Sequence, residues 1–362
     1  MRPRLKRTIE AISAPDGDLV LMRPGGEDVR VESPDDDERA LLLALDGNQT
    51  VGSLERRFGV QQVGDAIARM QELDLIEDAA DDDLLPTAEL ARFDRQLRYF
   101  SDARTFAGPT PSECQTRLRD ARVAILGVGG LGGRVAWELA ACGVGELRLI
   151  DGDRVEVSNL NRQIQYTEAD LGRLKVETMA ARLRAFNSRI RVTATARRLE
   201  AQAQLADFVD GVDVVVGAAD WPAYEIETWC NAACFEAGIP HIGMAQFPPK
   251  VKVGPFYIPG KSGCYECQKI AWRRDYPLFD AAVEQLRRKP SPAATLGPTS
   301  GLIGAQVGMD ILHFLTGLIE PGSINAACVY DMRTMEVERV PVIAEPDCPQ
   351  CSHLQPKGAT SL

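Results

Sequence analysis

The stretch RVAILGVGGLGGRVAWELAACG, residues 122–143, decides the fold of this chain. It opens with an apolar run that predicts a buried strand, passes through a glycine-rich turn, and continues into an apolar helix that ends at Gly143. Glycines in a G-x-G-x-x-G turn let the backbone approach phosphate, and the N-terminus of the following helix supplies N–H donors. The candidate phosphate-binding glycines are Gly127, Gly129, Gly130 and Gly132.

Strand patterns continue on the C-terminal side of this turn. Residues 146–153, 189–199 and 212–220 are predicted strands, and the last of them is nearly all apolar, as expected for a strand buried on both faces. Strands that alternate with helices predict an α/β fold, a Rossmann-like and mostly parallel sheet with helices on both faces. A plain tight turn in such a sheet and an NAD-dependent oxidoreductase are both open alternatives at this point.

The polar residues beyond the second strand favour a nucleoside triphosphate over NAD. Asp151 ends that strand, where its carboxylate could accept hydrogen bonds from ribose hydroxyls. Several phosphate charges need amides and cations around them, and Mg²⁺ needs a carboxylate, which Asp220 offers at the end of the last strand. For any one of these residues alone, a surface charge or a loop cap is an open alternative. The further candidates are Asp153, Asn159, Arg162, Gln163 and Lys175.

Taken together, these motifs resemble the ThiF/MoeB/HesA group of the ubiquitin-activating-enzyme superfamily. The resemblance rests on GVGGLG, IDGDRVEVSNLNRQ, GRLK, AAD and, before the sheet, RFDRQLRYF at 92–100, and it covers roughly residues 90–352. It implies an enzyme that adenylates a carboxyl group with Mg-ATP and releases pyrophosphate. A carboxylate that attacks an α-phosphate is an anion approaching an anion, so cations that cover the phosphates lower the barrier.

The resemblance also implies a role for each matching residue. Gly129, Gly130 and Asp151 would lie on the adenosine side, and Asp220 would lie near Mg²⁺ and the substrate carboxylate. The residues implied on the phosphates are Asn159, Arg162, Gln163 and Lys175. Arg95 would reach into the site of a neighbouring subunit, which implies a homodimer. The predicted catalytic set is therefore Arg95, Arg162, Lys175 and Asp220.

Two C-x-x-C pairs predict a structural metal site. They are Cys264-Tyr-Glu-Cys267 and Cys348-Pro-Gln-Cys351. Each pair can turn both sulfurs towards one metal, and two pairs make the closed Cys₄ site that is typical of structural Zn²⁺. The alternatives are a redox dithiol and simple packing. We expect the site to hold the C-terminal segment against the 264–267 loop.

The other cysteines give no sign of a covalent nucleophile. Some members of the resembling family carry substrate as a thioester on a cysteine, but the corresponding segment, 271–301, contains none. Cys230 and Cys234 lie one helical turn apart and are expected in the core. This favours direct use of the acyl-adenylate.

An extra module precedes the adenylation segment. Residues 18–32 alternate around Pro24-Gly25-Gly26 and predict a hairpin, and three helices are expected after it: from Asp35 to about Gly47, after Thr50, and over 61–78. The acidic stretch 78–90 suits a linker. We therefore predict a small winged-helix-like domain, residues 1–84, followed by an adenylation domain, residues 85–362.

This module resembles the PqqD-like leader-recognition element of ribosomal peptide biosynthesis. Such an element binds an extended leader by strand addition to the hairpin edge, with apolar side chains docking against the third helix. The expected edge lies near Val29 and Val31, facing the third helix around Ile67 and Met70. A leader-binding module joined to an adenylating domain resembles the peptide adenylases of microcin C-type and pantocin-type pathways. The partner expected is therefore a precursor peptide, with a dimerisation or stability module as the alternative.

Composition narrows the remaining classes. A net charge of −11 disfavours nucleic acid as a partner, because an acidic protein repels the phosphate backbone. No apolar run approaches the roughly 20 residues that span a bilayer, and no secretory signal is recognisable, so a cytoplasmic protein with no membrane contact is expected. The competing functions are activation of a ubiquitin-like sulfur carrier, an inactive leader-binding scaffold, and the NAD-dependent oxidoreductase.

Overall fold

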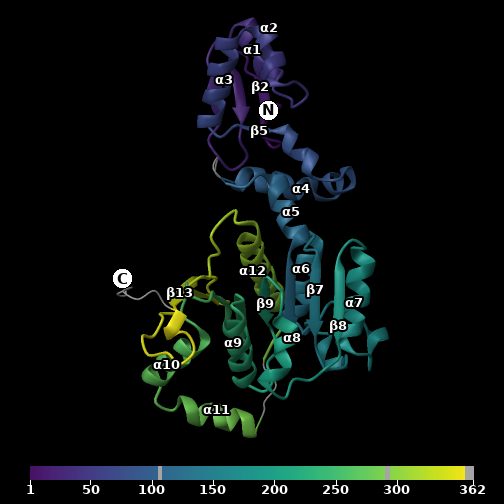
Figure 1. Ribbon diagram of the computed structural model, residues 1–362, viewed down its shortest axis with the longest axis vertical. Coiled ribbons are helices and arrows are strands. Elements are labelled where there is room, and N and C mark those ends of the chain that lie inside the picture. Colours follow the sequence, from purple (N-terminus) through teal and green to yellow (C-terminus); the bar gives the residue numbers. More distant parts are fainter. Residues whose placement is uncertain (105–107, 290–293, 355–362) are drawn as a thin grey trace. The chain divides into compact units, whose positions relative to one another are not determined.

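The computed structural model describes residues 1–104, 108–289 and 294–354, and the chain divides into two compact units. Unit 1 comprises Met1–Arg117 with Thr316–Ile319, and unit 2 comprises Leu118–Leu315 with the residues from Glu320 onward. Both are drawn in Figure 1. Within the described residues, no helix combines the length and apolar character that a membrane span requires.

Unit 2 is built on one eight-stranded sheet in the order β13-β12-β11-β10-β9-β6-β7-β8. The strands from β10 to β8 pair in parallel, whereas β10, β11, β12 and β13 are joined by antiparallel pairs. The predicted α/β sheet is confirmed, with an antiparallel half that the sequence did not reveal. The strand bounds are β6 Arg122–Leu126, β7 Glu146–Ile150, β8 Arg191–Thr195, β9 Val214–Gly217, β10 His241–Phe247, β11 Lys250–Tyr257, β12 Ala326–Asp331 and β13 Val337–Pro341.

Helices cover this sheet on both faces (Figure 1). α8 (Ala206–Val209) and α9 (Glu225–Ala237) share one core cluster with Ala124, Leu126 and Val215, the side chains of one sheet face. Because side chains alternate along a strand, Val123 and Ile125 lie on the opposite face. The remaining helices of this part are α6 Gly132–Cys142, α7 Lys175–Phe186, α10 Tyr265–Asp275, α11 Phe279–Arg288 and α12 Gly297–Thr316.

The strand register sets where the loops of the site begin. Leu126 of β6 pairs with Ile150 of β7 and with Gly217 of β9, and Ile150 pairs with Thr195 of β8. The carboxyl ends of four parallel strands therefore lie at the same edge of the sheet. Ligands bind outside this edge in open α/β sheets.

Unit 1 starts as a small module with its own core. The predicted hairpin is present as β3 (Leu19–Met22) paired with β4 (Val29–Val31), and β2 (Glu10–Ser13) adds a third strand. The three helices follow as α1 Asp36–Leu43, α2 Val51–Phe58 and α3 Val60–Glu72. Asp35 caps α1 in a capping box with Glu38, and Thr50 caps α2.

Two expectations for this module are wrong. The third helix ends at Glu72, and the residues after it form β5 (Ile76–Asp78), which pairs with β1 (Pro3–Leu5). Asp74 has a φ of +54°, a turn that breaks the helix before Leu75 enters the core. Ile67 and Met70 were expected to face a bound leader. They are 8% and 6% exposed, because they pack into the core of the module itself.

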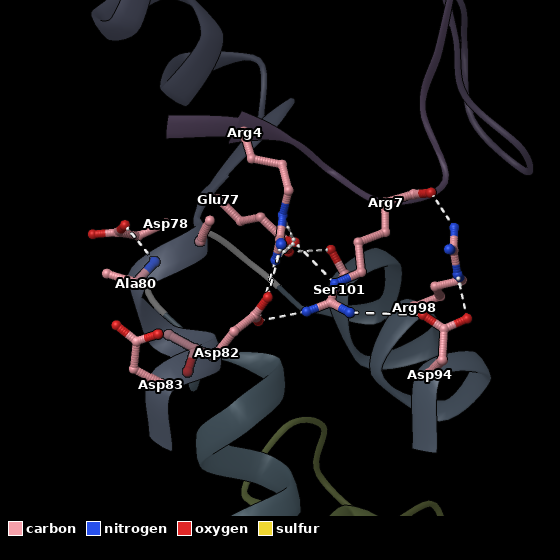
Figure 2. Close-up of polar contacts among 12 residues, drawn as sticks. Arg4, Arg7, Glu77, Asp78, Ala80, Asp82, Asp83, Asp94, Arg98 and Ser101 are labelled. Atoms are coloured by element: carbon pink, nitrogen blue, oxygen red, sulfur yellow. Dashed lines mark hydrogen bonds and ion pairs between the residues drawn. The ribbon is translucent and has the colours of Figure 1, made fainter. Parts of the chain in front are cut away.

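The acidic stretch expected as a linker is also structured. Residues Ala79–Leu84 form the 3-10 helix η1, and α4 (Thr87–Ala103) follows. Asp82 of η1 pairs with Arg4 at 2.8 Å and with Arg7, and Arg4 also pairs with buried Glu77 at 2.7 Å. Figure 2 shows this network.

The same network ties α4 to the module. Ser101 of α4 donates to Glu77 at 2.7 Å, and Arg98 donates to the backbone carbonyl of Arg7. Arg7 also lies 3.7 Å from Asp94, which pairs with Arg98 at 3.0 Å. By contacts, the first unit therefore runs past residue 84 to Arg117, and includes α4 and most of α5 (Pro111–Asp120). The division of function after residue 84 stays a prediction.

Candidate active site

A cavity of about 970 Å³ lies in unit 2 at the carboxyl edge of the parallel strands. It is lined by most of the residues that the sequence singled out for nucleotide binding. These are Gly127, Gly129, Gly130, Asp151, Asp153, Asn159, Arg162, Gln163, Lys175 and Asp220. Gly132 does not line it.

The glycines of the turn have two different functions. Gly127 has a φ of +88°, and a Cβ on it would lie 2.9 Å from the carbonyl oxygen of Ala218. A Cβ on Gly132 would lie 2.0 Å from the carbonyl oxygen of Gly127. Both positions therefore need glycine because the turn packs closely against β9 and against itself. Gly132 serves the fold and not the cavity.

Gly129 and Gly130 instead face polar side chains of the cavity. A Cβ on Gly130 would lie 3.1 Å from Ser300 Oγ and 3.4 Å from Arg162 Cγ, and one on Gly129 would lie 3.5 Å from Gln163 Nε2. Side chains at these two positions would crowd the groups expected to bind phosphate. Ser300 belongs to the first turn of α12, and its hydroxyl accepts from Gln246 at 2.8 Å.

Two residues that the sequence did not single out hold this turn in place. Gln165 donates to the carbonyl of Gly129 at 2.7 Å, and the Tyr166 hydroxyl donates to that of Val128 at 2.8 Å. Both side chains are buried. The polar run after Asp151 thus contributes supports for the turn as well as candidate ligands.

Asp151 is positioned by the turn itself. Its two carboxylate oxygens accept backbone N–H groups of Val128 and Asp153, each at 2.8 Å. Burial raises the pKa of Asp151, although these two bonds oppose the shift. Each carboxylate oxygen has a second lone pair, so ribose hydroxyls could still donate to it.

Asp153 holds two cations beside Asp151. The Lys175 ammonium lies 3.2 Å from one of its oxygens, and the Arg198 guanidinium lies 2.8 Å from the other. Burial raises the pKa of Asp153, but the bonds and charges of both partners outweigh it and hold that pKa below its usual range. Lys175 is buried and lines the cavity, so water screens its charge little.

Arg197 and Arg198 were placed in the third strand by the sequence pattern. The strand ends at Thr195, so both arginines follow its carboxyl end and line the cavity. Gly152 permits this, because a Cβ on it would lie 2.6 Å from the backbone nitrogen of Arg198. Ligands bind beyond the carboxyl ends of parallel strands, so both arginines could have been identified from the sequence if the predicted strand had ended at residue 195 instead of 199.

The residues expected on the phosphates follow one short loop. Asn159 is buried, and its Oδ1 accepts a hydrogen bond from the backbone N–H of Glu156 at 3.0 Å. This oxygen therefore caps the loop, which was the alternative to a role in phosphate binding. Arg162 donates to the carbonyl of Ser158 at 2.8 Å and to Asn161 at 3.0 Å. Gln163 is buried, and its Oε1 has no hydrogen-bond partner among the described residues.

Asp220 follows β9 and is exposed to the cavity. Its carboxylate makes no hydrogen bond or ion pair with any described residue. An oxygen ligand free of protein partners suits Mg²⁺, which prefers one or two carboxylates together with phosphate oxygens and water. The residues present therefore fit the expected metal.

Arg95 lies in unit 1. It is exposed on α4, the helix that the ion-pair network fastens to the N-terminal module. Its expected role in a neighbouring subunit stays a prediction.

The four cysteines of the C-x-x-C pairs come together. All four are fully buried, and their sulfurs lie within 4.8 Å of one another. The Sγ–Sγ distances are 3.8 Å for Cys264–Cys267, 3.5 Å for Cys264–Cys348 and 3.4 Å for Cys267–Cys351. These separations are too long for disulfides, and they are near the roughly 3.8 Å edge of a tetrahedron of sulfurs about one Zn²⁺.

The cysteines outside this cluster are not placed for catalysis. All of them lie within the described residues, and none lines the cavity. Burial raises the pKa of Cys114 to about 12 and that of Cys142 to about 11, so both thiols stay protonated. Cys230 and Cys234 are buried 4.0 Å apart, as the helical spacing predicted. Residues 290–293 of the segment without cysteine lie outside the described residues.

Comparison with known proteins identifies the class. Residues 93–352 match the ThiF family. The molybdopterin-synthase adenylyltransferase of Escherichia coli (strain K12) is 30% identical over 270 residues, which cover 74% of this chain and 98% of that protein. The chain therefore belongs to the ThiF family of E1-like adenylyltransferases, and the resemblance inferred from the motifs is confirmed. This membership removes the NAD-dependent oxidoreductase.

Two solved structures extend the likeness to the whole chain. The crystal structure of E. coli MccB matches with a TM-score of 0.76 at 25% identity and covers 100% of both chains. The microcin C7 biosynthetic enzyme MccB in complex with N-formylated MccA matches with a TM-score of 0.76 at 25% identity, covering 97% of this chain and 100% of that one. The layout of a small N-terminal module before an adenylation fold is thus confirmed.

Proposed function

We propose that this protein adenylates a carboxyl group on a ribosomally made precursor peptide, using ATP and releasing pyrophosphate. One observation supports this choice within the family. The match to molybdopterin-synthase adenylyltransferase spans nearly all of that relative but only 74% of this chain, whereas the match to MccB spans both chains completely. The additional part is the N-terminal module, which resembles a leader-recognition element.

The cations of the cavity supply the electrostatics of this reaction. Lys175, Arg162 and Arg198 would cover the phosphates, and Asp151 would orient the ribose. Bound Mg²⁺ would neutralise phosphate charge beside Asp220. The substrate carboxylate attacks the α-phosphorus, its oxygen forms the new P–O bond, and the bond to pyrophosphate breaks. No proton moves in this step, so the protein needs only to position the carboxylate and the phosphates and to screen their negative charges.

The metal of the cysteine cluster is proposed to be Zn²⁺ with a structural role. Four buried thiolates close the coordination shell and leave no position for substrate. His353 is exposed, and it is not needed as a ligand because the four thiolates already fill the coordination shell. The site would fasten the 348–351 segment to the start of α10, as the sequence predicted.

Peptide binding and assembly are proposed from the module and from Arg95. β4 is an edge strand of the sheet β2-β3-β4, so a leader could add to it through backbone hydrogen bonds. The side chains of the leader must contact residues other than Ile67 and Met70, because these two pack in the core of the module. A homodimer in which Arg95 serves the other subunit is the proposed assembly.

The decisive experiment searches for a short open reading frame beside this gene and treats its product with enzyme and ATP. We expect a mass change on the peptide, and ATP–pyrophosphate exchange that depends on it. Likeness to the sulfur carrier protein ThiS adenylyltransferase of Escherichia coli (strain K12), 32% identical over 238 residues, favours a sulfur carrier as the second candidate. Exchange with such a carrier and none with the peptide would establish that candidate instead. An inactive leader-binding scaffold would bind peptide and catalyse no exchange.

A further inference from the structure

Glu227 is a buried carboxyl group in the wall of the cavity that none of the roles above uses. It lies in the first turn of α9 and lines the cavity together with Asp220 and Ile226. Its Oε2 is buried and has no hydrogen-bond partner among the described residues. Leaving such an oxygen unpaired costs folding free energy, and such groups are concentrated at functional sites.

Charged groups from three other elements face Glu227, but none is paired with it. Lys269 of α10 donates to Glu266 at 2.6 Å and to Thr228 at 2.9 Å, and the Lys252 ammonium of β11 lies 5.7 Å from the centre of the Trp272 ring. Asp220, after β9, contributes a negative charge. The tyrosines whose hydroxyls sense its charge are Tyr224, Tyr257 and Tyr265.

These surroundings hold Glu227 near its titration midpoint at neutral pH. Burial raises the pKa of Glu227 from 4.5 to about 7; its own backbone N–H and the two lysines oppose the shift, and Asp220 adds to it. Adenylation of a carboxylate transfers no proton, so the proposed reaction has no need of Glu227 as an acid or a base. What its Oε2 lacks is a donor, and the open side of the site is the cavity.

A peptide would bring such a donor with its carboxyl group. The residue that carries the activated carboxyl has a backbone N–H, and its side chain can carry an amide or amine N–H. We propose that Glu227 is a substrate-binding residue that accepts a hydrogen bond from an N–H group of the peptide residue whose carboxyl is adenylated. This inference rests on the proposed function and names the residue that selects its substrate.

The binding should depend on pH. An ionised carboxylate accepts an N–H hydrogen bond more strongly than a protonated carboxyl. The KM for the peptide should therefore fall as the pH rises through about 7, where Glu227 ionises. Burial lowers the pKa of Lys252, and the charge of Glu227 opposes that shift.

The test compares Glu227→Ala and Glu227→Gln with the wild type in ATP–pyrophosphate exchange. The probe is a synthetic copy of the peptide that changes mass in the experiment above. Glu227→Ala should raise the KM for this peptide by about 10- to 100-fold, with the KM for ATP within about twofold. Glu227→Gln should remove the pH dependence of the peptide KM from about pH 6 to about pH 8.

The matched control is Glu236→Gln. Glu236 lies on the same helix, is exposed, and bonds only to Gln202 at 3.1 Å among the described residues. It should leave both KM values unchanged. Because Glu227 is unpaired, its variants should melt at or above the wild-type temperature. Melting well below it, with equal losses for ATP and peptide, would assign Glu227 a structural role and overturn the proposal.

Two altered peptides identify the donor. If methylation of the backbone N–H raises the KM of the wild type but not that of Glu227→Ala, the donor is the backbone. If replacing the side-chain N–H raises the KM of the wild type but not that of Glu227→Ala, the donor is the side chain. A wild-type peptide KM in Glu227→Ala across the pH range would overturn this inference alone, because the enzyme would still adenylate its peptide. Absence of exchange by the wild type with the peptide would instead remove the proposed function.

Discussion

The sheets of the two units are buried to different extents. In unit 2, β6, β7 and β9 are buried along nearly their whole length, whereas β2 and β4 of unit 1 are partly or fully exposed. Unit 1 compensates with ion pairs between its first residues, η1 and α4 (Figure 2). A unit fixed by a buried sheet can hold charged ligands at the strand ends, and a small exposed sheet leaves edges for a partner strand.

This difference suggests that chemistry and recognition are separable. The proposed chemistry lies in unit 2 on side chains that a motif encodes. The proposed recognition of the leader lies in unit 1 on backbone edges, which no motif encodes, whereas Glu227 of unit 2 is proposed to bind the residue that reacts. Four predictions test this separation.

The largest effect is expected at Asp220. Replacing Asp220 with Ala should lower ATP–pyrophosphate exchange by about 10³-fold, or about 4 kcal/mol, because it removes the proposed carboxylate ligand of Mg²⁺. Peptide affinity, measured by fluorescence anisotropy, should not change. Asp207→Ala, at an exposed position of α8, is the control. Wild-type exchange in Asp220→Ala would disprove the metal role.

The next effect concerns the metal cluster. Cys348→Ser should reduce bound zinc from about one ion per chain to near none, since three thiolates leave the site open. We expect a loss of roughly 3 kcal/mol and a melting temperature lowered by about 6–12 °C. Cys328→Ser changes a half-buried thiol outside the cluster and should keep its zinc. A zinc-free wild type that melts at the same temperature as the loaded protein would contradict the structural role.

Removal of residues 1–84 tests recognition directly. The truncated protein should bind ATP with an affinity within about twofold of the wild type, and it should bind peptide at least about 30-fold more weakly, or about 2 kcal/mol. Isothermal titration measures both. The cut also removes the partners of Ser101 and Arg98, so circular dichroism must show that α4 is retained. Unchanged peptide affinity would place recognition outside the module.

The smallest effect is expected in the ion-pair network. Glu77→Gln should destabilise the protein by about 1.5 kcal/mol, because the buried carboxylate of Glu77 binds Arg4 and Ser101. Glu72→Gln removes an exposed pair with Arg69 and should change stability by less than about 0.5 kcal/mol. Urea unfolding compares the two. Equal losses would show that the network adds nothing beyond surface charge.

Several features of the site could be predicted from the sequence. The glycine turn, Asp151 and Asp220 follow strand ends, which can be located from apolar runs, and they lie at the cavity. Lys175, at the start of α7, was expected there from the family resemblance and also lines the cavity. The roles of these residues stay predictions. The prediction that the two cysteine pairs come together is confirmed, because the C-x-x-C spacing is typical of residues that share one metal. Arg198 was missed because the strand pattern appeared to run to residue 199.

Other features could not have been found this way. Glu227 looks like any acidic residue at a helix start, and only packing shows that its oxygen is buried without a donor. The antiparallel strands β11 and β12 pair through residues 75 or more apart, such as Val253 with Cys328, and such pairing leaves little local trace. The acidic stretch after Asp78 was expected to be a linker because its arginine partners lie at the other end of the module.

By itself the sequence determined the α/β fold, the family, the glycine turn and the two cysteine pairs, because each follows from local spacing or from an unbroken apolar run. The tertiary structure alone decided which carboxyl lies unpaired in the cavity, which arginines reach it, and which segments the ion pairs fasten together. Burial and pairing depend on residues distant in the chain, so no local pattern can specify them.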